Sequence, residues 1–96
     1  MLDLRHLETF RAVAVTKNFT RAAQMLGYCQ STVTTHIMAL ERELGAPLFI
    51  RNRFSKTVVL TEGGRRALEY AGRLLALVDE TKATIQIGRE TAVMAE

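Results

Sequence analysis

The stretch 19-FTRAAQMLGYCQSTVTTHI-37 decides the fold, because two short periodic segments meet in it at one glycine. Ala23, Gly27 and Val33 follow the spacing Ala-x3-Gly-x5-Val. A small alanine suits the crossing point of two helices, and glycine suits the left-handed backbone at a helix end. Val33 can then fill the space between the helices. The stretch therefore predicts two helices joined by a tight turn.

One helix is predicted before this turn and another within the stretch itself. The first runs from about residue 4 to residue 16, with Asp3 as its N-cap. Its apolar positions recur at spacings of three, three and four, at Leu4, Leu7, Phe10 and Ala14. The second runs over residues 21–26, with Thr20 as its N-cap and Gly27 at its end.

The third predicted helix follows the turn and runs from about Gln30 to Leu44. Its apolar seam has spacings of four, three and four, at Val33, Ile37, Leu40 and Leu44. Gly45 ends the helix, and Pro47 prevents its continuation. The seam is expected to be buried, which leaves the opposite side of this helix exposed.

A β-hairpin and a long helix are predicted to complete the chain. The apolar runs 48-LFI-50 and 58-VVL-60 flank the polar, basic segment 51-RNRFSKT-57. Thr61 can cap a final helix that begins near Glu62. A heptad-like seam follows at Ala67, Ala71, Leu74, Val78, Thr81, Ile85 and Gly88. Continued to residue 90, this helix would be about 43 Å long, so part of its apolar face must meet another chain or a further domain.

The sequence thus predicts a mainly α protein with the winged helix-turn-helix fold. Three helices and a two-stranded wing occupy residues 1–61, and a long linker and dimerisation helix with a C-terminal tail occupies residues 62–96. Ninety-six residues is the size of one compact domain. Homodimerisation through the final helix is assigned to Ala67, Ala71, Leu74, Val78 and Ile85.

The polar face of the third helix is predicted to contact double-stranded DNA. Six polar side chains lie off its apolar seam: Gln30, Ser31, Thr32, Thr34, Thr35 and His36. Glutamine can bond adenine, serine and threonine can serve several base edges or phosphates, and threonine methyls can touch thymine methyls. The alternative is an ordinary solvated face, but such faces favour Glu, Lys and Arg. No charged residue occurs from Gly27 to Leu40, which favours the DNA interpretation.

Basic residues of the hairpin are predicted to add phosphate or minor-groove contacts. Arg51, Arg53 and Lys56 cluster there without an acidic residue, although an exposed charged tip is the plain alternative. Thr20 and Arg21, near the start of the second helix, are added to this surface. Residues 1–60 contain eight Lys or Arg and four Asp or Glu, a balance compatible with nucleic acid but also common on ordinary surfaces.

Several other classes are disfavoured by the residue inventory. The longest apolar run, 74-LLALV-78, is far too short for a membrane span, and the N-terminus lacks the apolar core of a secretory signal. Cys29 and His36 would lie about 10 Å apart on one helix, too far for a catalytic pair. The single cysteine and two histidines do not supply a metal site, and no cofactor is expected. A redox role for Cys29 stays open, and the lack of an internal disulfide suits a reducing cytosol.

Four strings in continuous order resemble the N-terminal domain of LysR-type transcriptional regulators: 4-LRHLETFRAVA-14, 19-FTRAAQMLG-27, 40-LERELGAPLFIR-51 and 60-LTEGGRRAL-68. The resemblance extends from about Leu2 to Ile85. It implies a bacterial, cytoplasmic, sequence-specific DNA-binding regulator whose last helix pairs antiparallel with its twin. It also implies an effector-binding domain that is absent from this sequence, and possible tetramers of the full-length protein.

The family's contact motif, Ser-Gln-Pro-x-hydrophobic-Ser-Arg, corresponds here to 29-CQSTVTT-35. Gln30 matches, so the resemblance implies a base contact for it, and Thr34 replaces a serine conservatively. Cys29 is a poorer N-cap than the usual Ser or Thr by about 1 kcal/mol, and Ser31 is a candidate to become the cap instead. Thr35 stands where arginine is frequent and loses one phosphate or guanine contact. The wing is one or two residues longer than the common form.

The main rival function is a dimerisation module without specific DNA readout, based on the final helix alone. Such a module would dimerise but would show no salt-sensitive affinity for DNA. A dimeric DNA-binding protein would instead favour an inverted-repeat operator. The sequence does not identify that operator, the regulated genes, the effector, or activation as opposed to repression.

Overall fold

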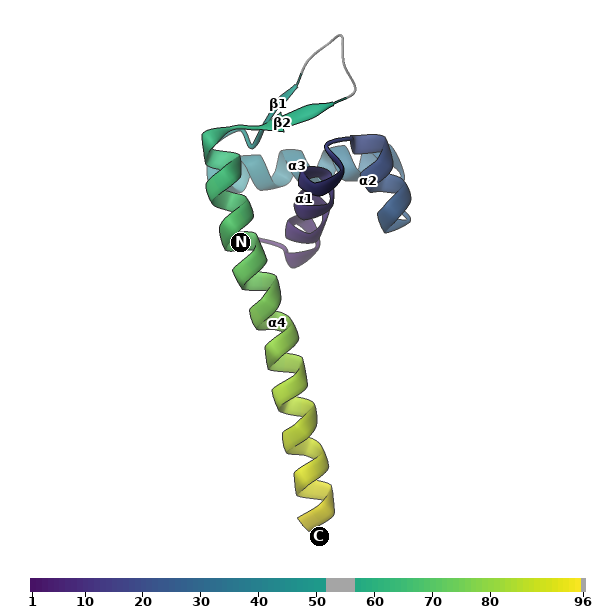
Figure 1. Cartoon of the computed structure of the whole chain (residues 1–96), viewed down its shortest axis with the longest axis vertical. Helices are drawn as coiled ribbons and strands as arrows, with labels where there is room; N and C mark the ends of the chain where they lie inside the picture. Colours follow the sequence, from purple (N-terminus) through teal and green to yellow (C-terminus); the bar gives the residue numbers. More distant parts are fainter. Residues whose placement is uncertain (52–56, 96) are drawn as a thin grey trace.

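The computed structural model describes the backbone of residues 1–51 and 57–95, and the side chains of residues 1–51 and 57–87. Its elements are α1 (Leu4–Thr16), α2 (Phe19–Leu26), α3 (Gln30–Leu44), β1 (Phe49–Arg51), β2 (Val58–Leu60) and α4 (Glu62–Ala95). Figure 1 shows α1, α2 and α3 packed together below the wing of β1 and β2, with α4 running away from them. The molecule measures 63 × 25 × 20 Å, and α4 gives it this elongated shape. The predicted winged helix-turn-helix is confirmed.

The hydrophobic core lies where α1 meets α2, α3 and the start of α4. Its largest fully buried apolar side chains are Phe10, Val13, Val33, Ile37, Leu40 and Leu48. The predicted seams of α1 and α3 are therefore confirmed in their central turns. Their ends differ, because Leu4 is 44% exposed and Leu44 is 42% exposed. Leu4 is the first residue of α1 and Leu44 is the last residue of α3, so each lies at an end of its helix.

The connection between α1 and α2 corrects one predicted cap. Lys17 takes left-handed backbone with φ 56°, and Asn18 is extended, so α2 begins at Phe19. The Asn18 Oδ1 atom accepts a hydrogen bond from the Arg21 N–H at 3.0 Å and caps the helix. Thr20, the predicted cap, lies inside the first turn. Asparagine and threonine both make good N-caps, so the turn at Lys17 decides between them.

The two strands of the wing are antiparallel, and their register pairs Phe49 with Leu60, Ile50 with Val59 and Arg51 with Val58. The Val58 N–H donates to the Lys17 carbonyl at 3.0 Å, which anchors the wing on the turn between α1 and α2. Gly27 and Gly45 end α2 and α3 as predicted, with φ of 73° and 72°.

The start of α4 is fixed by a close approach to the segment before the wing. Thr61 is confirmed as its cap: the hydroxyl accepts from the Gly64 N–H at 2.9 Å and donates to the Pro47 carbonyl at 2.7 Å. Gly64 is buried, and a Cβ there would overlap the Leu48 carbonyl oxygen and lie 3.0 Å from a methyl of Leu60. This position therefore accommodates glycine alone without rearrangement.

Among the side chains of α4 that the structure describes, those up to Leu75 pack on the rest of the domain. Ala71 is 1% exposed and Leu75 is 4% exposed, and both belong to the core. From Ala76 to Ile87 the described side chains are exposed, apart from the half-buried Val78. This agrees with the expectation that the helix is too long to pack wholly on its own domain.

None of the helices in the described part of the chain is long and apolar enough to cross a membrane.

Candidate nucleic-acid interface

The side of α3 opposite its buried seam carries four exposed residues at spacings of four, three and four: Ser31, Thr35, Met38 and Arg42. Because this spacing keeps them on one face of a helix, they form a continuous outward stripe. Burial of Val33, Ile37 and Leu40 on the other side holds this face outward. This arrangement agrees with the predicted orientation of the third helix. Met38, which is 49% exposed, also belongs to the outward stripe, although it was not among the residues predicted from the sequence.

The N-terminus of α3 is open to solvent. Cys29 occupies the N-cap position but makes no side-chain capping hydrogen bond, and its thiol is exposed. The expectation that Ser31 becomes the cap is wrong, since α3 already begins at Gln30. Gln30 is exposed, and its Oε1 atom accepts a long hydrogen bond from the Thr20 hydroxyl at 3.4 Å. This bond connects the two helices of the helix-turn-helix at the surface.

The six polar side chains predicted on this face do not all lie equally outward. Gln30, Ser31 and Thr35 are exposed, whereas Thr32 and Thr34 are half-buried. The Thr35 hydroxyl donates to the Ser31 carbonyl at 2.9 Å, so its hydrogen is committed to the helix backbone.

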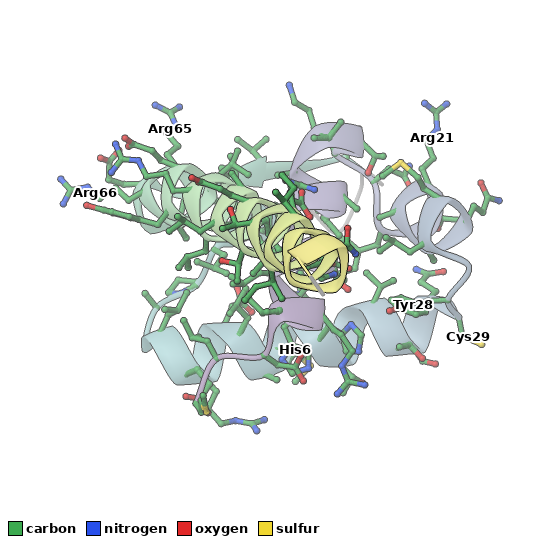
Figure 2. All side chains as sticks on the ribbon, turned by 90° about the horizontal axis from the view of Figure 1, so that it is seen from below. His6, Arg21, Tyr28, Cys29, Arg65 and Arg66 are labelled. Atoms are coloured by element: carbon green, nitrogen blue, oxygen red, sulfur yellow. The ribbon has the colours of Figure 1, made fainter. Side chains whose placement is uncertain are left out.

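His36 lies differently from the exposed residues of this face, because its side chain turns from the outward stripe toward α1. Its Nδ1 atom lies 2.8 Å from the hydroxyl oxygen of the buried Thr9. Its ring lies 4.6 Å from the ring of His6 and 5.3 Å edge-on from that of Tyr28, measured between centroids. Figure 2 shows Tyr28 turned in toward α3 and Cys29 turned out to solvent. His36 therefore joins helices, a role its spacing alone did not reveal.

Burial, hydrogen bonds and neighbouring charges shift pKa values in this cluster, those of His36 and Asp3 among them. Burial lowers the pKa of His36, and the nearby His6 and Arg5 lower it further while Asp3 opposes them. Hydrogen bonds from the Arg5 guanidinium and backbone lower the pKa of Asp3 to about 2. Asp3 is therefore ionised at neutral pH, and its side chain also caps α1 as predicted.

The base of the wing is tied to α3 by Glu41, which the sequence analysis did not single out. One carboxylate oxygen accepts from the Leu48 N–H at 2.7 Å, and the other lies 3.8 Å from the Arg51 guanidinium. Arg51 also lies over the ring of Phe19, 4.9 Å from its centroid. Its half-exposed side chain is thus held by the fold. Arg53 and Lys56, the other predicted wing contacts, lie outside the described residues.

Three further arginines, Arg21, Arg65 and Arg66, lie on opposite sides of the domain. Figure 2 shows Arg21 projecting outward from α2, and Arg65 and Arg66 projecting from the first turns of α4 at the far side. Arg66 lies 3.5 Å from Glu62, an exposed pair one helical turn apart.

Among residues 1–51 and 57–87, no cluster of three or more His, Cys, Asp or Glu side chains could hold a metal ion.

The predicted dimerisation seam on α4 divides into two parts. Ala71 is buried against its own domain and Ala67 packs beside the core, so these two are occupied within the chain. Leu74 is 39% exposed and Ile85 is 66% exposed. Leu77, which the heptad count omitted, is 56% exposed and lines a shallow depression with Glu80, Thr81, Thr84 and Ile85. The exposed apolar side of α4 therefore keeps Leu74 and Ile85 of the predicted seam and adds Leu77, whereas Ala67 and Ala71 pack within the chain.

The fold and this surface define a winged helix-turn-helix protein with a protruding C-terminal helix. Residues 4–65 match the bacterial regulatory helix-turn-helix protein, lysR family, and the chain belongs to this family. It is 43% identical over 90 residues to the uncharacterized HTH-type transcriptional regulator YwqM of Bacillus subtilis, covering 94% of this chain and 30% of that protein. It is 45% identical over 78 residues to the HTH-type transcriptional regulator BudR of Klebsiella aerogenes, covering 81% of this chain and 53% of BudR.

Solved structures agree with this assignment. The crystal structure of the CbnR_DBD-DNA complex superposes with a TM-score of 0.85 at 32% identity, over 90% of this chain and 97% of that one. The BenM_DBD/catB site 1 DNA complex gives a TM-score of 0.81 at 37% identity, over 88% of this chain and 91% of that one. The chain spans about a third of the length of YwqM and about half that of BudR.

Proposed function

We propose that the chain is the DNA-binding part of a sequence-specific transcriptional regulator, with α3 in the major groove of duplex DNA. The observation that carries this proposal is the outward stripe of α3, held away from the core by the burial of Val33, Ile37 and Leu40. An α-helix fits the major groove, and its N-terminal residues lie nearest the base edges. The exposed Gln30 stands at this end of α3 and is assigned a base contact.

The basic residues are assigned to the DNA backbone or minor groove. Arg51 lies at the base of the wing, and Arg53 and Lys56 follow it in the sequence. Thr20 and Arg21 stand near the start of α2, and Arg21 is exposed there. Such contacts fix the position of a protein on the duplex but carry little sequence information.

The proposal extends to assembly and context. The exposed leucines of α4 favour a homodimer through this helix, and a symmetric dimer favours an inverted-repeat operator. A longer protein would carry an effector-binding domain after α4, with tetramers as a possible assembly. The proposed role needs no catalytic centre or cofactor, and it places the protein in the cytoplasm, where bacterial DNA lies.

The test is selection of bound duplexes from a random pool, followed by titration of the selected duplex at several salt concentrations. Affinity is expected to fall by roughly 0.9 log units per log unit of salt for each phosphate neutralised. Gln30→Ala is expected to cost about 1–3 kcal/mol and to relax base preference. The matched control is Gln24→Ala, since Gln24 is an exposed glutamine on α2. Unchanged specificity and affinity in Gln30→Ala would remove the recognition role from α3.

The exposed side of α4 also favours a second function, a dimerisation module without DNA readout. Leu74, Leu77 and Ile85 would supply the interface in both cases. The same experiment separates the two: a dimer that selects no sequence and binds duplexes weakly at every salt concentration favours the module. Salt-sensitive, sequence-selective binding favours the regulator.

A further inference from the structure

The middle of the outward stripe is apolar at its surface, although it lies on a polar helix face. The Thr35 hydroxyl donates its hydrogen to the Ser31 carbonyl at 2.9 Å. A threonine hydroxyl has a single hydrogen, so the groups that Thr35 still offers to a ligand are its methyl and the lone pairs of its oxygen. Met38, one turn further along, exposes 49% of its surface. A thioether has almost no hydrogen-bonding capacity and contacts apolar groups best.

We propose that Thr35 and Met38 select thymine by contact with its 5-methyl group, so that the half-site under the middle of α3 is rich in A·T pairs. This inference rests on the proposed function, because it requires α3 to lie in the major groove. The thymine methyl is the apolar group that base edges present in that groove. The exposed methyl of Thr35 and the thioether of Met38 can therefore both make an apolar contact with the thymine methyl.

The spacing of the two side chains fits neighbouring base pairs. Residues three apart on a helix are separated by about 4.5 Å along its axis. Successive base pairs are separated by about 3.4 Å along the duplex. A helix lying along the groove would thus bring Thr35 and Met38 to adjacent or next-adjacent steps, and thymines at both steps would meet both side chains.

The charge pattern of α3 removes the usual means of selecting guanine. Guanine is read most often by arginine or lysine bonding its O6 and N7 atoms. No such residue occurs between Gly27 and Glu41, and Arg42 lies about 10 Å beyond Thr35 along the helix axis. Gln30, at the start of α3, is suited to adenine. The start of α3, at Gln30, and its middle, at Thr35 and Met38, therefore both favour A·T pairs.

The experiment replaces thymine by deoxyuridine, one position at a time, in the duplex selected from the random pool. This change removes the 5-methyl and leaves base pairing intact. The unaltered protein is expected to lose about four-fold in affinity at each contacted thymine, the equivalent of one buried methyl-sized group. Thr35→Ser keeps the hydroxyl and loses the methyl, so its sensitivity to deoxyuridine should vanish at one position. Met38→Ala should lose sensitivity at another, and Met38→Leu should keep it.

All three variants alter exposed residues, so their folding is checked by thermal unfolding before binding is compared. Equal affinity for thymine and deoxyuridine duplexes, with salt-sensitive and selective binding intact, would overturn the inference and leave the proposed function standing. Selection of G·C pairs under the middle of α3 would overturn it in the same way. Absence of selective, salt-sensitive binding would instead defeat the proposed function and this inference together.

Discussion

The Nδ1 atom of His36 lies 2.8 Å from the Oγ1 atom of Thr9, which joins α3 to the buried side of α1. The Thr9 hydroxyl also donates to the Arg5 carbonyl at 3.0 Å. Because the hydroxyl has one hydrogen, the imidazole must donate from Nδ1, and neutral His36 carries its hydrogen there. A second proton would enter at Nε2 and place a positive charge beside His6 and Arg5.

Acid should therefore weaken the fold through His36. Its pKa is lowered in the folded protein, first by burial and then by His6 and Arg5. The unfolded chain then binds a proton more readily than the folded chain, so the stabilising effect is complete above the ordinary pKa of about 6.5. It is lost as the pH falls from there through the lowered folded-state pKa. Urea denaturation at pH 7.5 and pH 5 should show a lower midpoint in acid.

The control for this prediction is His36→Gln, which can still bond Thr9 but cannot be protonated in this range. Its midpoint should fall less between the two pH values than that of the unaltered protein. His6→Gln removes one neighbouring titratable ring and should reduce the difference without abolishing it. An equal loss in His36→Gln and the unaltered chain would assign the acid sensitivity to other groups.

Gly64→Ala should destabilise the domain while Gly72→Ala should not. A Cβ at Gly64 overlaps the Leu48 carbonyl oxygen, so the start of α4 must shift, at a cost of about 1–3 kcal/mol or more. Gly72 lies within the same helix, where a Cβ meets nothing within 4 Å. Alanine there should stabilise the helix by about 0.5–1 kcal/mol. Thermal unfolding of both variants measures the contrast, and two equal shifts would contradict it.

The helices and strands could be predicted from the sequence because the signals that start and end them involve residues close together in the chain. The ends of α2 and α3 at Gly27 and Gly45, and the cap of α4 at Thr61, depend on residues within one turn of each helix. Asn18, not the predicted Thr20, caps α2, because the left-handed backbone at Lys17 ends α1 and starts α2 at Phe19. Both residues are good caps and lie close together in the sequence. Propensity alone could not choose between them.

Contacts between residues far apart in the chain could not be predicted from the spacing of apolar and polar residues. His36 stands three residues after Val33, and its partner Thr9 is 27 residues away. Glu41 bonds Leu48 across the turn that ends α3, a contact that no helical spacing indicates. Ala71 fits a heptad seam equally well whether that seam faces a partner or its own domain, and only the packed structure shows that it is buried. The family resemblance located the stretch from Cys29 to Thr35, not the direction of each side chain.

Glu41→Ala should cost more than Glu41→Gln. The Leu48 N–H is covered by the fold and bonds a Glu41 carboxylate oxygen at 2.7 Å, so loss of the acceptor should cost about 1–3 kcal/mol. Glutamine keeps an acceptor and loses the ion pair with Arg51, which at 3.8 Å and partial exposure contributes about 0–1 kcal/mol. Urea denaturation of the two variants separates these contributions. Equal destabilisation would show that the charge of Glu41, not its role as acceptor, matters.

Leu77→Lys should weaken the proposed homodimer, whereas Ala76→Lys should not. Leu77 is a large apolar side chain, 56% exposed, and it lines the shallow depression on α4 together with Ile85. Ala76 is also exposed, but at about 100° per residue it points to a different side of the helix. Since burial of a leucine contributes about 1.5–3 kcal/mol, Leu77→Lys should raise the dimer dissociation constant at least roughly ten-fold. Sedimentation equilibrium measures this constant for both variants.

The same pair of variants connects dimerisation to DNA binding. On an inverted repeat, Leu77→Lys should lose affinity because two half-sites are no longer bound by one dimer. On a duplex with a single half-site, its affinity should match that of Ala76→Lys and the unaltered protein, since α3 is unchanged. A Leu77→Lys protein that stays dimeric with unaltered dissociation would place the interface on another side of α4. A monomeric Leu77→Lys protein with full affinity for the inverted repeat would show that the two half-sites are bound independently.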